Sequence, residues 1–170
     1  MKHLLDQTGL ALRAASLLLA GAGGVALLLM LLLVSANIAL RPMNGGIRGT
    51  MELSGYLCAL AVGLCMPAAQ LAGSHIAAGL WAHSLPRGVL HAQRALCSLF
   101  AACLLAAAGV EIAGVAEYAD VMGEYIDGFD FSYALMALGL SLGLFTHAAI
   151  FLHALLCALF CPDVAYGRAA

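Results

Sequence analysis

The positions of the charged residues constrain this chain more than any other feature. Four stretches contain no Asp, Glu, Lys or Arg: residues 14–40, 53–86, 95–110 and 131–162. A helix needs about 20 apolar residues to cross the hydrocarbon layer of a membrane. The sequence therefore predicts an all-α integral membrane protein with four transmembrane helices, near residues 14–40, 53–80, 92–114 and 132–160.

The third predicted span depends on the side chains at its ends. Its charge-free stretch, 95–110, is the shortest of the four. It reaches full length if Arg94 extends its charged end toward water and Glu111 lies near the opposite interface.

Composition excludes several classes of protein. Hydrophobic residues make up 64% of the chain and charged residues 9%, against about 45–50% and 25% in soluble domains. So few charges cannot cover a soluble particle, which excludes a soluble enzyme or a disordered chain. The net charge of −2 provides no basic surface for nucleic acid. No linker or repeat divides the chain, so residues 1–170 are predicted to form one membrane domain.

Basic residues near the ends of the spans predict the orientation. Five of them (Lys2, Arg13, Arg87, Arg94 and Arg168) fall on one side of the membrane if four helices cross it, and two (Arg41 and Arg48) fall on the other. Short cytoplasmic segments carry the excess of Lys and Arg. Both termini are therefore predicted to be cytoplasmic, with the acid-rich segment between the third and fourth spans outside.

This acid-rich segment has the pattern of an amphipathic helix. Its carboxylates Glu117, Asp120, Glu124 and Asp127 fall within an arc of about 80° on a helical projection. We expect the third helix to continue into, or be followed by, such a helix at the external membrane surface. The acidic face is either simply solvated or a docking face for a periplasmic partner. A row of carboxylates along one helix is a poor calcium site.

Small residues recur at the spacing of helix-packing motifs. Gly55, Ala59 and Gly63 form one such stripe in the second span, and Gly139 and Gly143 form another in the fourth. Small residues allow helix backbones to approach closely in lipid. The pattern leaves open whether these stripes pack helices within the chain or against a partner.

Cysteine and histidine suggest redox or metal chemistry only weakly. The six cysteines form no C-x-x-C pair, and inside spans cysteine behaves as a small hydrophobic residue. A haem-b membrane anchor needs paired axial imidazoles on facing helices. Only His147 lies well inside a span, whereas His75, His83 and His91 gather near the second loop. We expect no bound cofactor, metal or catalytic site, and the haem-b anchor remains the alternative function.

No Asp, Glu, Lys or Arg lies at the centre of a predicted span. Substrate and ion pathways in transporters are lined by such residues. The chain alone therefore has no evident translocation pathway, which favours a subunit that supports another protein.

An ordered set of short motifs in residues 37–86 resembles one family. The motifs are NIALRP at 37–42, GTMELSGYL at 49–57, GSHI at 73–76 and LP at 85–86. They resemble the small permease subunit, DctQ type, of tripartite ATP-independent periplasmic (TRAP) transporters. The matching positions are an arginine closing the first helix (Arg41), a glutamate opening the second (Glu52), a histidine near its end (His75) and the proline after it (Pro86).

The resemblance implies a division of labour. A large permease subunit would carry the substrate and sodium, and a periplasmic binding protein would deliver the substrate, typically an organic acid. The small subunit would brace the large one in a bacterial inner membrane. Arg41 and Glu52 would lie near the same interface, where they could pair with each other or with lipid headgroups.

Overall fold

Four long helices form the fold of this protein in a computed structural model, which describes residues 2–43, 45–73, 86–126, 128–129 and 131–160. The helices are α1 (Lys2–Leu40), α2 (Thr50–Leu71), α3 (Arg87–Met122) and α4 (Tyr133–Phe160), with a short 3-10 turn at Arg41–Met43. All four are long and apolar enough to cross a membrane. The prediction of a four-span, all-helical membrane protein is confirmed for the described residues.

The helix ends differ from the predicted spans. Helix α1 begins at Lys2, well before residue 14, and α3 continues to Met122, beyond residue 114. Charged residues limit the part of a helix that lies in lipid, but the backbone hydrogen bonds continue into water. Helix α2 ends early, at Leu71, because Gly73 takes a left-handed backbone conformation (φ 69°) and its N–H donates to the Gln70 carbonyl oxygen at 3.2 Å. Residues 74–80 of the second predicted span lie outside the described residues.

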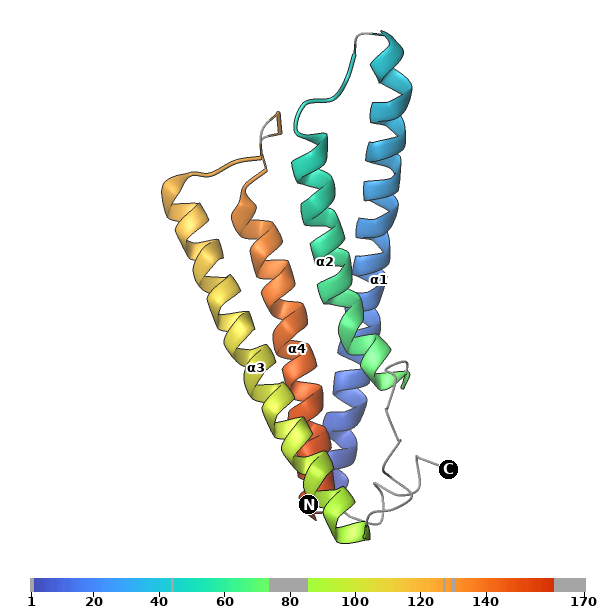
Figure 1. The fold of residues 1–170 in the computed structure, drawn as a ribbon, viewed down its shortest axis with the longest axis vertical. Coiled ribbons are helices and arrows are strands. Elements are labelled where there is room, and N and C mark those ends of the chain that lie inside the picture. Colours follow the sequence, from blue (N-terminus) through green and yellow to red (C-terminus); the bar gives the residue numbers. More distant parts are fainter. Residues whose placement is uncertain (1, 44, 74–85, 127, 130, 161–170) are drawn as a thin grey trace.

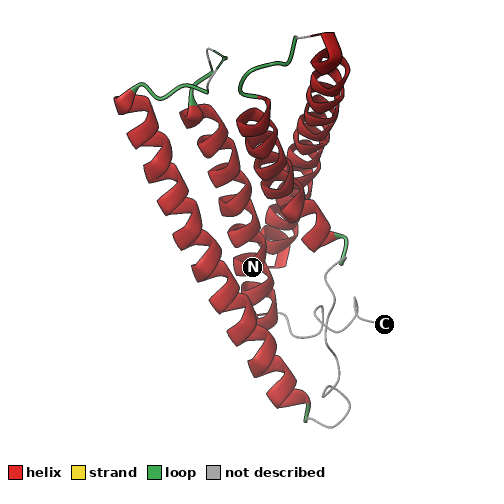
Figure 2. Ribbon diagram, turned by 45° about the horizontal axis from the view of Figure 1, so that its top comes forward, coloured by secondary structure: helices red, strands yellow, loops and turns green. Residues whose placement is uncertain are grey.

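The helices lie side by side in the order α3, α4, α2, α1 (Figure 1). Helix α4 packs against both α3 and α2, and α1 packs mainly against α2 with a smaller contact on α4. Within the described residues, α3 packs closely against α4 alone. The arrangement is an open layer and not a closed four-helix bundle, as the tilted view also shows (Figure 2). All four helices carry large exposed apolar side chains.

The centre of the layer is a close contact between the backbones of α2 and α4. A Cβ atom on Gly143 would collide with the carbonyl oxygen of Gly63, and one on Gly139 would lie 2.5 Å from a methyl carbon of Leu60. Pro67 is fully buried in α2. Because proline has no N–H, the Gly63 carbonyl lacks its usual helical donor. That same carbonyl faces Gly143 across the contact.

Helix α1 approaches α2 in a similar way. A Cβ atom on Gly23 would lie 2.7 Å from the Cys65 sulfur and 3.0 Å from the Ala61 carbonyl oxygen. Further along the same pair, buried side chains form a core cluster to which the α3–α4 loop adds Ile126, which is 1% exposed; its members are Ala26, Leu53, Leu57, Ala61 and Ile126. One loop residue therefore helps to hold α1 and α2 together.

A histidine links the opposite ends of the chain. His153 of α4 lies with its Nε2 atom 3.0 Å from the carbonyl oxygen of Leu5 in α1. A Cβ atom on Gly9 would lie 3.4 Å from the same ring. The start of α1 and the end of α4 are thus joined by a side chain, which gives His153 a structural role.

The contact between Gly63 and Gly143 predicts that a glycine-to-alanine substitution will change the free energy of unfolding differently at a packed and at an open position. Gly143→Ala should lower the free energy of unfolding by about 1–3 kcal/mol, because the added methyl group overpacks the interface. Gly55→Ala should leave that free energy unchanged or raise it by about 0.5–1 kcal/mol, because a Cβ atom there meets nothing within 4 Å. Unfolding in detergent, followed by helical circular dichroism, measures both. Equal stability of the two variants would show that the contact does not hold the layer together.

Candidate functional site at the two-loop end

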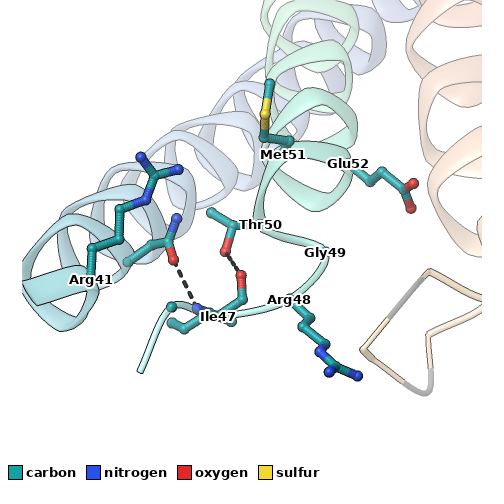
Figure 3. Close-up of a pocket in the computed structure, with 9 residues that line it drawn as sticks. Arg41, Ile47, Arg48, Gly49, Thr50, Met51 and Glu52 are labelled. Carbon is teal, nitrogen blue, oxygen red and sulfur yellow. Dashed lines mark hydrogen bonds between the residues drawn. The ribbon is translucent and has the colours of Figure 1, made fainter. Parts of the chain in front are cut away.

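Two loops meet at one end of the layer, and we call this the two-loop end (residues 41–49 and 123–132). The first loop is held to α1 by Asn37, whose Oδ1 atom accepts a hydrogen bond from the Ile47 N–H at 2.8 Å. The Thr50 hydroxyl donates to the Ile47 carbonyl oxygen at 2.7 Å. These bonds fix the loop against both helices and place Arg41, Arg48 and Glu52 around one pocket (Figure 3).

The second loop packs against the first through Gly128. Gly128 has a φ of 78°, and a Cβ atom on it would lie 3.1 Å from the Arg48 carbonyl oxygen. The loop folds back on itself through a hydrogen bond from the Ile126 N–H to the Phe131 carbonyl oxygen at 3.0 Å. Ser132 then caps α4 by accepting a hydrogen bond from the Ala134 N–H at 3.2 Å. The two loops therefore form one structural unit.

Glu52 joins α2 to α4 at this end. Its Oε2 atom accepts a hydrogen bond from the Tyr133 hydroxyl at 3.1 Å. The ring of Tyr133 packs edge-on against that of Tyr56, with centroids 4.9 Å apart. A hydrogen bond to an ionised acceptor is stronger than one between neutral groups. Glu52 and the two tyrosines thus fix the spacing of α2 and α4 near the loops.

The sequence leaves two alternatives for Arg41 and Glu52: a pair with each other, or contacts with lipid headgroups. Both residues line the same pocket, as expected from their positions. Figure 3 shows that Glu52 extends toward α4 while Arg41 lies on the opposite side of the pocket. Among the described residues, no ion pair joins them, because the Tyr133 hydroxyl holds the Glu52 carboxylate on the α4 side.

The predicted acidic face is divided by the end of α3. Gly123 takes a left-handed conformation (φ 65°), and the Glu124 N–H donates to the Ala119 carbonyl oxygen at 3.0 Å, which closes the helix at Met122. Glu117 and Asp120 lie exposed on α3, but Glu124 follows the helix. Asp127 lies outside the described residues. The expectation that one amphipathic helix carries all four carboxylates is therefore wrong for Glu124.

The small residues of the two predicted stripes fall into two groups, one packed between helices and one exposed. Gly63, Gly139 and Gly143 pack α2 against α4 within the chain. Gly55 and Ala59 are exposed, and a Cβ atom on Gly55 would meet nothing within 4 Å. Ala59 borders an apolar groove of about 200 Å³ between α2, α3 and α4, together with residues that include Tyr56, Ile112 and Leu140. This groove and the exposed pair form an open surface on the layer.

The remaining sequence candidates have structural surroundings or lie outside the described residues. His147 is buried in α4 and stacks on Phe151, with ring centroids 5.2 Å apart. Pro86 precedes α3, and its carbonyl oxygen accepts hydrogen bonds from Val89 and Leu90 at 3.0 and 3.2 Å. His75 lies outside the described residues. No group of three metal-ligating side chains occurs in the part of the chain that the structure describes.

Sequence reasoning missed three residues that organise this structure. Tyr133 is the first residue of α4, and its hydroxyl donates a hydrogen bond to Glu52. Pro67 of α2 has no N–H to donate to the Gly63 carbonyl. Gly128 packs the second loop against the first. Pro67 had a detectable signal, since it lies four residues after a glycine of the small-residue stripe. Tyr133 and Gly128 had none, because their partners are distant in the sequence.

The fold and the charges define a class of protein. The chain is a multi-pass helical membrane protein whose described helices carry no Asp, Glu, Lys or Arg in 14–40, 53–71, 95–110 or 133–160. The family model "Tripartite ATP-independent periplasmic transporters, DctQ component" matches residues 30–161. The chain belongs to this family, the small permease subunits of TRAP transporters. No curated protein and no solved structure matches the chain. The family gives no support to a haem-b anchor.

The Glu52–Tyr133 hydrogen bond predicts a coupled effect on stability. Tyr133→Phe and Glu52→Gln should each lower the melting temperature in detergent, and the double variant should lose little more than either single variant. Tyr118→Phe is the matched control, because it removes a hydroxyl from an exposed tyrosine of α3. Additive losses, or an equal loss in Tyr118→Phe, would contradict the assigned bond.

Proposed function

We propose that this chain is the scaffold subunit that braces the large permease subunit of a TRAP transporter. The large subunit would carry out sodium-coupled uptake of an organic acid that a periplasmic binding protein delivers. The observation that carries this proposal is the family match over residues 30–161. The open layer of helices supports it, because the large apolar side chains exposed on all four helices offer surface for a partner and for lipid.

The distribution of charge supports a bracing role over a conducting one. A pathway for an organic acid and sodium through the membrane needs polar or ionisable groups at depth. The described middle parts of the four helices contain no Asp, Glu, Lys or Arg, and the one histidine at mid-helix, His147 of α4, is buried against Phe151. The ion and substrate sites would therefore belong to the large subunit, and the small subunit would enlarge the fixed part of the complex in the bacterial inner membrane.

The groove between α2, α3 and α4 is the surface we assign to the large subunit. Gly55 and Ala59 present a small-residue edge on α2, and the groove beside them is almost wholly apolar. In lipid, close packing of small residues drives the association of helices. A transmembrane helix of the large subunit resting on this edge would bury both residues.

The carboxylates at the end of α3 and in the loop that follows it are the surface we assign to the binding protein. Glu117 and Asp120 lie exposed on the last turns of α3, and Glu124 lies just beyond the helix. With both termini cytoplasmic, this end would face the periplasm.

Neutralising Glu117, Asp120, Glu124 and Asp127 together should reduce uptake that depends on the binding protein, whereas Asp6→Asn at the other end should not. Unchanged uptake would leave these carboxylates as a solvated surface.

Recovery of the large subunit tests the proposed bracing contact. The double variant Gly55→Leu/Ala59→Leu should recover much less of the large subunit in a detergent pull-down, because leucine side chains hold the two helices apart. Gly88→Leu is the matched control, since Gly88 is also exposed with open space around it but lies at the far end of α3.

Two outcomes of this pull-down distinguish a failure of the proposed groove contact from a failure of the proposed scaffold function. Full recovery with the double variant would remove the groove from the interface while leaving the family role intact. No recovery of a large subunit even with the unchanged chain would contradict the proposed function itself.

A further inference from the structure

Glu111 of α3 is a carboxylate whose depth follows from the packing of α3 on α4. Two residues before it, a Cβ atom on Gly109 would lie 3.0 Å from a ring carbon of Phe145. Phe145 lies about 18 Å from the start of α4 at Tyr133. Because α3 and α4 run in opposite directions (Figure 1), Glu111 lies about 3 Å closer to that start. Its depth of about 15 Å is half of the roughly 30 Å hydrocarbon layer.

The helices beside α3 carry no charge at this level. Here Gly63 of α2 contacts Gly143 of α4. Along α2, the nearest charged residue in the described part is Glu52, about 16 Å from Gly63. The whole of α4, Tyr133–Phe160, contains no Asp, Glu, Lys or Arg. Counted along α3 alone, Glu111 falls just beyond the charge-free middle of the helix, so its depth follows only from the neighbouring helices.

The Glu111 side chain is exposed and has no partner in the part of the chain that the structure describes. No hydrogen bond or ion pair there involves its carboxylate. Charged side chains inside a membrane are costly, and they face protein or a water-filled cavity, where they pair with other polar groups. Glu111 therefore requires a partner that the described residues do not provide.

Glu111 lies on the rim of the apolar groove between α2, α3 and α4. Val115, one turn further along α3, lines that groove, and residues four apart on a helix point about 40° from each other. On either side of Glu111, Ala107 and Gly114 are exposed, and a Cβ atom on Gly114 would meet nothing within 4 Å. A helix lying in the groove can therefore approach the carboxylate closely.

We propose that Glu111 forms an ion pair with an arginine or lysine on the transmembrane helix of the large subunit that occupies this groove. The pair rests on the proposed scaffold function and specifies the chemistry of the partner helix. Apolar packing alone allows one helix to slide along another, whereas opposite charges at mid-membrane depth fix their register. Because the two charges neutralise each other at the rim, the pair braces the large subunit and forms no pathway through this chain.

Carbodiimide labelling of the purified subunit in detergent tests the depth of Glu111 without the large subunit. Dicyclohexylcarbodiimide enters apolar regions and reacts with carboxyl groups there, so it should label Glu111, as peptide mass spectrometry measures. A water-soluble carbodiimide with an added amine should label Glu117 much more than Glu111, because Glu117 lies between two residues that pack against the first turn of α4. Equal labelling of the two by the water-soluble reagent would place Glu111 in water and overturn the proposal.

Recovery of the large subunit in a detergent pull-down tests the pair itself. Glu111→Gln keeps the size of the side chain and removes its charge. Recovery should fall at least about ten-fold, because the partner cation is left buried without a counter-charge. Glu111→Asp, which keeps the charge, should retain most of the recovery. Asp6→Asn is the matched control, since it makes the same chemical change at an exposed carboxylate of α1.

The outcomes distinguish a failure of the pair from a failure of the scaffold function. Equal recovery with Glu111→Gln and with the unchanged chain would overturn the pair and leave the scaffold function standing. Equal dicyclohexylcarbodiimide labelling of Glu111 in the isolated chain and in the complex would also overturn the pair, because a paired carboxylate is shielded. No recovery with the unchanged chain would contradict the scaffold function and the pair together. If Glu111→Gln fails to fold, labelling of the unchanged chain with and without the large subunit decides the question.

Discussion

The close approach of α2 and α4 at Gly63 and Gly143 is the contact on which the rest of the structure depends. Helix α4 lies between α3 and α2, and α1 joins the layer mainly through α2. In lipid there is no hydrophobic force to draw helices together, so a backbone contact without side chains between is a main source of attraction. Pro67 strengthens it by leaving the Gly63 carbonyl for the α4 side.

The two ends of the layer are fixed by polar groups. Glu52 and Tyr133 hold α2 to α4 near the loops, and His153 holds α4 to α1 at the other end. The layer is thus set at its centre by packing and at its ends by hydrogen bonds. A fixed open layer with apolar faces agrees with the role of a scaffold subunit, whose task is to present surface to a partner and to lipid.

The sequence predicted the number and character of the helices because membrane spanning is a property of composition over about 20 residues. The sequence could not predict where the helices end, because single glycines in a left-handed conformation set those positions. Gly123 ends α3 through its left-handed conformation and so separates Glu124 from Glu117. Gly55 and Gly63 looked equivalent, yet residues eight apart on a helix point about 80° from each other. Only Gly63 therefore faces α4, and the Glu52 partner Tyr133 is 81 positions away in the sequence.

Reconstituted uptake measures the central claim, that this chain supports transport by a large permease subunit without conducting substrate itself. Vesicles containing both membrane subunits should take up an organic acid when the binding protein and a sodium gradient are present. Vesicles with either membrane subunit alone should show little or none. Uptake at the full rate by the large subunit without this chain, or uptake by this chain alone, would contradict the account.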